Sequence, residues 1–252
     1  MTKPIYRYLA DRKWRDHKRL IIMQRVTKNY SIIPDILPHI DPTMDVDLAF
    51  VRKTVHPGDM VDSRLSSVPP KMKIQPFDDK GERLVTIAVV DPDVPNVEKN
   101  GFDYRCHYLA ANIPISPTKT SLYLGDLGDN DSQLILPWLP PFAQKGSPYH
   151  RLGIFVFEQH DNAPINVGSL KAPKEPLEGG AKGMIERDGF IMRSFVDKYR
   201  LTPVGVHVFR TQWDENTRWV MEKFGIPGAD VQFVREKLGK LPYKKKDGAR
   251  YR

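Results

Sequence analysis

Three groups of residues in the middle of the chain carry side chains suited to binding an anion. Asp91 and Asp93 follow an apolar run, His107 begins another, and a proline-rich loop leads to His150. Imidazole and backbone N–H groups donate hydrogen bonds to oxyanions, and a carboxylate such as Asp91 can orient a histidine by accepting its proton. Brought together, these groups would form a small pocket. The histidines would have to outweigh the carboxylate, which repels phosphate.

A hydrolytic site is the alternative reading of the same residues, with Cys106 as the nucleophile. Neighbouring residues of a strand point to opposite faces, so Cys106 and His107 cannot pair locally if both lie on one strand. The sequence has no Gly-x-Ser-x-Gly motif. Its single cysteine excludes an internal disulfide and a zinc site built on cysteine pairs. We therefore expect no enzymatic activity, no metal and no cofactor, and we predict that Cys106 is a small buried apolar residue.

Short strands must position these groups. Runs of strand length occur at residues 46–51, 71–74, 83–90, 107–113 and 152–159, and the third ends at the Asp91-Pro92-Asp93 sequence. Several short strands with turns between them predict a β-sandwich or barrel. Two short helices follow, one containing Phe195 and Tyr199 and the other running from about Asp214 to Phe224.

The N-terminal residues predict a basic helix from Pro4 to about Asn29, with the proline in the first turn. Its expected apolar stripe consists of Ile5, Leu9, Leu20, Met23 and Val26. Prolines at positions 34 and 38 prevent the helix from continuing, so residues 32–42 are expected to form an extended connector. The sequence has no apolar run of about 18 residues, the length that a membrane-spanning helix needs.

The net charge of +8 is concentrated at the two ends. Residues 1–30 carry +7 and residues 235–252 carry +6, so the other 204 residues carry −5, the difference between +8 and +13. Basic ends on an acidic body indicate contact with a polyanion, although solvated tails would have the same composition. The residues expected to contact RNA are Arg12, Lys13, Arg15, Lys18, Arg19, Lys244, Lys245 and Lys246.

Taken together, the central motifs resemble the phosphatidylethanolamine-binding protein family over roughly residues 45–225. The matching segments are the Asp-Pro-Asp motif at 91–95, the histidine strand at 107–112, the Pro-Pro to His-Arg loop at 140–151, and the Pro-Val-Gly and Trp-Asp sequences at 203–205 and 213–214. The resemblance implies an anion pocket formed by Asp91, His107, Pro141 and His150. The sequence departs from the family pattern at Pro148 and Leu152, which puts ligand binding in this pocket in doubt.

The fold implied by this resemblance is mainly β (α+β), a sandwich with peripheral helices, a basic N-terminal helix and a basic C-terminal tail. The expected boundaries are 1–44 for the helix and connector, 45–225 for the sandwich and 226–252 for the tail.

The flanking sequences resemble one branch of the family, the fungal-type proteins of the mitochondrial large ribosomal subunit. The segments that show this resemblance are residues 4–9, 23–25, 33–38, 139–142 and 225–228. This implies a structural protein near the central protuberance, located in the mitochondrial matrix. Its partners would be the large-subunit rRNA and neighbouring ribosomal proteins. We expect no transit peptide in this chain. The alternative is a free-standing module that binds anions or phospholipids, or that regulates another protein.

Overall fold

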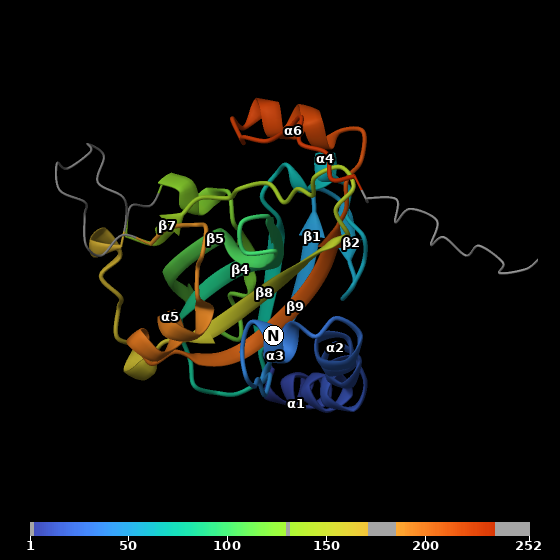
Figure 1. Cartoon of the computed structure of the whole chain (residues 1–252). Coiled ribbons are helices and arrows are strands. Elements are labelled where there is room, and N and C mark those ends of the chain that lie inside the picture. The colour runs from blue at the N-terminus through green and yellow to red at the C-terminus, as the bar shows by residue number, and fades with distance from the viewer. Residues whose placement is uncertain (1–2, 130–131, 171–184, 235–252) are drawn as a thin grey trace, which may run out of the picture.

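The computed structural model describes residues 3–129, 132–170 and 185–234, which form two antiparallel β-sheets packed face to face (Figure 1). The smaller sheet has the order β2-β1-β3-β6, formed by Lys53–Val55, Met44–Phe50, Lys71–Pro76 and Ser121–Tyr123. The larger sheet has the order β7-β5-β4-β8-β9, formed by Leu134–Leu136, Gly101–Ile115, Arg83–Asn96, His150–Glu158 and Thr202–Thr211. The predicted β-sandwich is confirmed.

The larger sheet is buried on both of its faces. Val85, Ile87 and Val89 of β4 point into an apolar cluster between the two sheets. Ala88 and Val90 of the same strand point into a second cluster, which lies under the helices. This explains why the run at 83–90 is apolar throughout instead of alternating with polar residues. Burial on both faces fixes the register of these strands, three of which carry the candidate site.

Helices cover the outer face of the larger sheet and one end of the sandwich. The N-terminal helix comprises α1 (Pro4–Lys13), the π-helical turn η1 (Trp14–Lys18), α2 (Arg19–Gln24) and a second π-helical turn η2 (Arg25–Asn29). Short α3 (Ile32–Asp35) and α5 (Met192–Tyr199) also contribute to the outer cluster. At the other end α4 (Ser63–Ser66) lies beside α6 (Thr217–Lys223), and the chain also contains the short turns η3 (Asp126–Asp129), η4 (His160–Asn162) and η5 (Val167–Ser169). Among the described residues, no helix is both long enough and apolar enough to cross a membrane.

The N-terminal helix has the predicted extent but buries a different face. Trp14, Ile22, Val26 and Tyr30 are buried, whereas Ile5, Leu9 and Leu20 are more than half exposed. Residues four apart drift by about 40° on a regular α-helix. The wider π-helical turns offset this drift and keep a four-residue repeat facing the body. The predicted stripe is therefore wrong for Ile5, Leu9 and Leu20.

Ion pairs fix this helix to the start of the smaller sheet. Lys18 contacts Asp45, with 2.6 Å between Nζ and Oδ1, and also Asp47. Arg19 pairs with Asp41 and donates to the carbonyl of Pro42 at 3.2 Å. Residues 3–44 thus share a core and polar contacts with the sandwich. The boundaries at 44/45 and 225/226 stay predictions.

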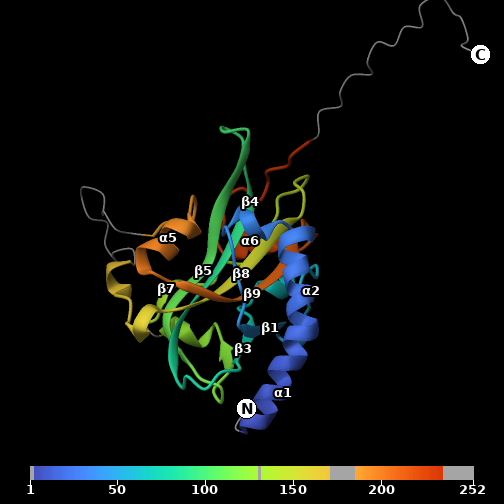
Figure 2. The same ribbon diagram turned by 90° about the horizontal axis from the view of Figure 1, so that it is seen from below.

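Several local predictions need correction. The strand at 83–90 does not end at Asp91 but continues to Asn96, because a bulge accommodates Pro92, which cannot donate to the ladder. The hairpin of β4 and β5 consequently projects beyond the sandwich (Figure 2). The connector is not fully extended, since it contains α3. The last helix begins at Thr217, because the carboxylate of Asp214 accepts hydrogen bonds from residues of both α4 and the turn before α6.

Candidate functional site

Asp91, His107 and His150 converge where three neighbouring strands meet one end of the inter-sheet core. His150 Nδ1 lies 2.7 Å from Asp91 Oδ2, and His107 Nε2 lies 3.8 Å from the same oxygen. Asp91 is two residues after Val89, and His150 is two residues before Leu152, both of which face that core. His107 is the extra residue of a bulge in β5, which turns its side chain toward the other two.

The loop after β7 holds His107 through two hydrogen bonds. His107 Nδ1 lies 3.0 Å from the carbonyl oxygen of Leu139, and the Leu139 N–H donates to the His107 carbonyl at 2.8 Å. Nδ1 must therefore carry the proton that it donates. The other nitrogen, Nε2, is buried and has no hydrogen-bond partner among the described residues, since 3.8 Å to Asp91 is too long. This leaves a polar atom at the site with unused hydrogen-bonding capacity.

Asp91 is the charged centre of the cluster. Burial by itself would raise the pKa of its carboxyl group, but the positive charge and hydrogen bond of His150, together with His107, outweigh that effect and hold the pKa well below its usual value. Its second oxygen accepts the Asp93 N–H at 2.8 Å. Asp91 therefore stays ionised at neutral pH and fixes His150 in one orientation.

Cys106 does not join this cluster. It packs into the outer apolar cluster, on the side of the sheet away from the space between the sheets, as predicted for a small buried apolar residue. Burial raises the pKa of its thiol to about 12, so the thiol stays protonated at neutral pH. A protonated, enclosed thiol is a poor nucleophile.

A cavity of about 270 Å³ opens beside the cluster. His150 lines it, whereas Asp91, His107 and Pro141 are buried and are not among the lining residues. The other lining residues come from the β4–β5 hairpin, the loop at 139–144, the segment after residue 184 and the end of α6; they include Val94, Pro95, Arg105, Leu139, Phe142, Arg187, Asp188 and Phe224.

Arg105 and Arg187 are lining residues that sequence reasoning missed. Arg105 lies over the ring of Phe142, 5.1 Å from its centroid, and pairs with Asp188. Arg187 donates to the carbonyls of Cys106 and His107, each at 3.1 Å. The spacing of Arg105 two residues before His107 was an available signal, because alternate residues of a strand share a face. Nothing in the local sequence placed Arg187 here.

Residues 228–233 pack against the loop that contains Gly146. The absence of a side chain at Gly146 makes this contact possible. Gly146 has a φ of +86°, and a Cβ there would lie 1.8 Å from the carbonyl oxygen of Phe233. The Phe233 N–H donates to the Lys145 carbonyl at 2.8 Å.

We expect Gly146→Ala to detach residues 228–233, because backbone atoms cannot yield to the added carbon. Hydrogen exchange at the Phe233 amide should become at least about tenfold faster. Gly81→Ala is the matched control, since Gly81 also has a positive φ, +77°, but has no atom within 4 Å of its Cβ position. Equal effects of both substitutions would show that strain at positive φ, and not the contact, is responsible.

The basic residues predicted to contact RNA fall into three groups. Lys18 and Arg19 are engaged with acidic residues of the connector and β1, so they serve to dock the helix. Arg12 and Lys13 are exposed, and Arg15 is exposed and pairs with Asp11 at 2.8 Å. Lys244, Lys245 and Lys246 lie outside the described residues. The RNA contact thus remains a prediction, carried in this part of the chain by Arg12, Lys13 and Arg15.

A family model described as phosphatidylethanolamine-binding protein matches residues 51–190, more than half of the chain. The chain belongs to the phosphatidylethanolamine-binding protein family, which confirms the resemblance noted in its motifs.

Individual relatives agree with this assignment. The large ribosomal subunit protein mL38 of Schizosaccharomyces pombe is 27% identical over 225 residues, which are 88% of this chain and 66% of that protein. The chain therefore spans slightly less than two thirds of that relative. Phosphatidylethanolamine-binding protein from Plasmodium vivax has a TM-score of 0.57 at 19% identity, over 76% of this chain and 97% of its own. The phosphatidylethanolamine-binding protein of Plasmodium falciparum has a TM-score of 0.55 at 20% identity, over 75% of this chain and 95% of its own. At these identities the two structures show the fold alone.

Proposed function

We propose that the chain is a structural protein of the large subunit of the mitochondrial ribosome. The observation that carries the proposal is the length of the similarity to the fission yeast ribosomal protein. It extends over 225 residues, whereas the family model matches residues 51–190. The similarity therefore includes sequence outside the shared family region. In this role the protein would contact rRNA and neighbouring proteins in the central protuberance, within the mitochondrial matrix.

The exposed side of the N-terminal helix supports this role. Arg12 and Lys13 point away from the buried face defined by Trp14 and Ile22. The pair between Arg15 and Asp11 is exposed to solvent, and such pairs contribute little, so a phosphate can replace the carboxylate. Lysine and arginine side chains in this setting neutralise phosphates without reading sequence.

Sedimentation tests the proposal directly. A tagged copy of the full protein, expressed in its own cells, should migrate with the large subunit when a mitochondrial lysate is centrifuged through a sucrose gradient. It should leave that fraction when magnesium is chelated and the subunit falls apart. A protein that stays at the top of the gradient under both conditions would contradict the ribosomal role and favour a free-standing module.

Neutralising the exposed basic residues should weaken RNA binding in a salt-dependent manner. For the triple variant Arg12→Gln, Lys13→Gln and Arg15→Gln, we expect the slope of log affinity against log salt to flatten by about 2 to 3. The amount of assembled large subunit should also fall.

The matched control is Lys53→Gln, Lys71→Gln and Lys73→Gln, which removes the same charge from exposed positions on the smaller sheet. If both triple variants flatten the slope equally, overall charge and not the helix governs RNA binding.

A second candidate function is binding of a small anion, as the family's pocket would imply. It is favoured by Arg105 and Arg187, the two arginines that line the cavity beside His150. Titration calorimetry with inorganic phosphate and with phosphoethanolamine tests this function. A heat of binding that the wild type shows and the Arg105→Gln variant lacks would support it. If neither compound gives a heat of binding to the wild type, the cluster of Asp91, His107 and His150 has a structural role.

A further inference from the structure

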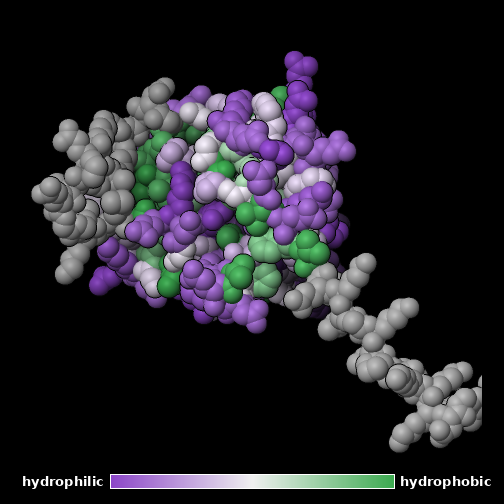
Figure 3. All heavy atoms as spheres, turned by 45° about the horizontal axis from the view of Figure 1, so that its top comes forward, coloured by the Kyte–Doolittle hydropathy of each residue, from purple (hydrophilic) through white to green (hydrophobic). Residues whose placement is uncertain are grey.

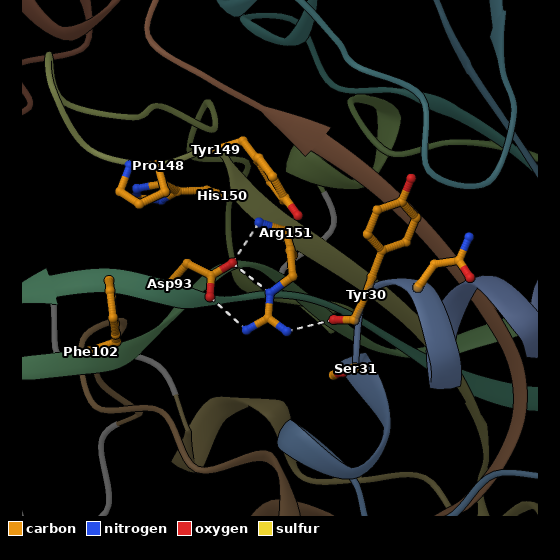
Figure 4. Close-up of a pocket in the computed structure, with 9 residues that line it drawn as sticks. Tyr30, Ser31, Asp93, Phe102, Pro148, Tyr149, His150 and Arg151 are labelled. Carbon is orange, nitrogen blue, oxygen red and sulfur yellow. Dashed lines mark hydrogen bonds and ion pairs between the residues drawn. The ribbon is translucent and has the colours of Figure 1, made fainter. Parts of the chain in front are cut away.

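A second cavity, about 370 Å³ in volume, lies on the other side of His150 and includes residues outside the matched family region. We call it the Tyr149 cavity. Figure 4 shows Tyr30, Phe102 and Tyr149 arranged around the ion pair of Asp93 and Arg151. Asn29, Tyr30 and Ser31, at the end of the N-terminal helix, form one wall, and Pro148 and His150 complete the lining.

The ion pair of Asp93 and Arg151 forms the floor of the Tyr149 cavity and is held in place by several hydrogen bonds. Arg151 donates to both oxygens of Asp93, from Nη2 at 2.6 Å and from Nε at 2.8 Å. Its Nη1 donates to the Tyr30 carbonyl at 2.5 Å and to Asp35 at 2.8 Å. Both Asp93 oxygens therefore already have hydrogen-bond partners. Arg151 serves two carboxylates, Asp93 and Asp35, and the floor is a fixed hydrogen-bonded network.

The rings of the Tyr149 cavity are open to a ligand. Phe102 is 59% exposed and Tyr149 is 41% exposed, although both line a concave site. Aromatic rings left exposed around a hollow offer faces on which a flat group can stack. The volume lies within the range of about 300–1,000 Å³ that is typical of small-molecule cavities.

A cation with unused donors stands beside these rings. The guanidinium of Arg210 lies over both Tyr30 and Tyr149, 5.0 and 5.1 Å from the ring centroids. Its Nε donates to the Gly58 carbonyl at 2.8 Å, which fixes the side chain. Its two Nη atoms have no hydrogen-bond partner among the described residues. They are thus free to donate to an anionic group placed next to a stacked ring.

We propose that the Tyr149 cavity holds one unpaired nucleotide of RNA. The base stacks on Tyr149 and Phe102, and Arg210 donates to an adjacent phosphate. Stacking on aromatic side chains with a neighbouring cation is how proteins recognise splayed-out bases in single-stranded RNA. The inference rests on the proposed ribosomal role and specifies where, apart from the basic helix, the protein would hold RNA.

The surface elsewhere favours this local contact over a broad apolar interface. On the face that carries α6, apolar side chains lie in separate patches within a polar surface (Figure 3). Trp219 and Phe224 are exposed there, at 49% and 42%. Large continuous apolar areas mark protein docking sites, whereas around α6 the apolar side chains on this face are interrupted by polar ones.

The test measures binding of the full protein to a short, unstructured RNA by fluorescence anisotropy, with an abasic oligonucleotide of the same length as a second probe. Tyr149→Ala should weaken RNA binding about 5- to 150-fold, the range expected for the loss of one stacked base. Tyr149→Phe should bind as the wild type does. Binding of the abasic probe should not change in either variant.

Salt separates the two contacts within the cavity. The loss in Tyr149→Ala should persist at high salt, because stacking is not screened. The loss in Arg210→Gln should shrink, because phosphate contacts are screened. Tyr123→Ala is the matched control, since Tyr123 on β6 is similarly exposed, at 37%. Wild-type affinity in Tyr149→Ala, or an equal loss in Tyr123→Ala, would overturn the proposal.

A protein occupant would give a different pattern. Tyr149→Ala would then leave RNA affinity unchanged while neighbouring ribosomal proteins dissociate from the purified subunit, and the nucleotide proposal would be wrong. Failure of the ribosomal role itself is distinguishable, because it appears in the sedimentation of the wild-type protein and not in the comparison of variants.

Discussion

The free energy of unfolding should fall by about 3 kcal/mol as the pH is lowered from 7 to 4, because His207 is buried as a neutral imidazole. Burial, reinforced by the positive charge of Lys18, lowers the pKa of His207 from 6.5 to about 4. Between these values the unfolded chain binds a proton that the folded protein excludes. The stabilisation is therefore complete above pH 6.5 and is lost as the pH falls toward 4.

Urea unfolding at several pH values measures this loss, and His207→Gln is the variant that isolates it. His207 Nε2 lies 3.2 Å from the Val55 carbonyl, and a glutamine amide can also donate there without titrating. The difference in stability between wild type and variant should change by about 3 kcal/mol across the window. The low pKa of Asp91 affects stability only near and below pH 4, so it does not mask the effect. A difference that is constant with pH would show that the pKa of His207 is the same in the folded and the unfolded protein.

Removing His150 should destabilise the protein by about 3 kcal/mol or more at neutral pH. His150→Ala leaves the ionised Asp91 buried and removes its 2.7 Å contact with His150. Breaking a buried ion pair on one side costs about 3–5 kcal/mol, because the other charge stays desolvated. Urea unfolding at pH 7 gives the value.

The double variant Asp91→Asn with His150→Ala tests whether the two groups act together. It should be more stable than the sum of the two single changes by about 1–3 kcal/mol, because the uncompensated charge is gone. Additive losses would mean that the pair is not coupled. Since His150→Ala weakens the fold, any assay of anion binding should rely on Arg105→Gln instead.

The candidate cluster was predicted from motifs because its three members lie on or beside the apolar runs that the motifs identify. Asp91 and His150 follow and begin apolar runs, so a strand assignment alone places them at an edge. Arg187 and the wall from α6 could not be predicted this way, because they reach the cavity from segments far along the chain.

Strand β9 was missed for a local reason. Its sequence contains Pro203 and Gly205, residues that usually interrupt strands. In the structure β9 has a bulge at Val204, opposite Val156 and Phe157 of β8, and Gly205 lets Val46 pack closely against the backbone. Only the partner strands reveal that these residues fit.

The basic helix was predicted in extent but not in orientation. Ile5 and Leu9 are four residues apart, and the buried residues Trp14, Ile22 and Val26 are also separated by multiples of four, but the two sets are out of phase and lie on different sides of the helix. The charges of Lys18 and Arg19 indicated exposure, but their acidic partners lie beyond two prolines (Asp41) or three (Asp45 and Asp47). Such pairs are set by tertiary packing and cannot be recognised from local sequence.

The docking of the N-terminal helix also constrains the order in which the protein can be built. Its buried side chains share a cluster with Phe155 of β8 and Val208 of β9, residues that leave the ribosome long after Val26. Until some 180 residues more have been synthesised, the helix has no surface to cover, and contacts of such separation form slowly. A nascent chain therefore presents an amphipathic, positively charged helix for most of its synthesis. Chaperones or nucleic acid can hold that helix before the sandwich exists to receive it.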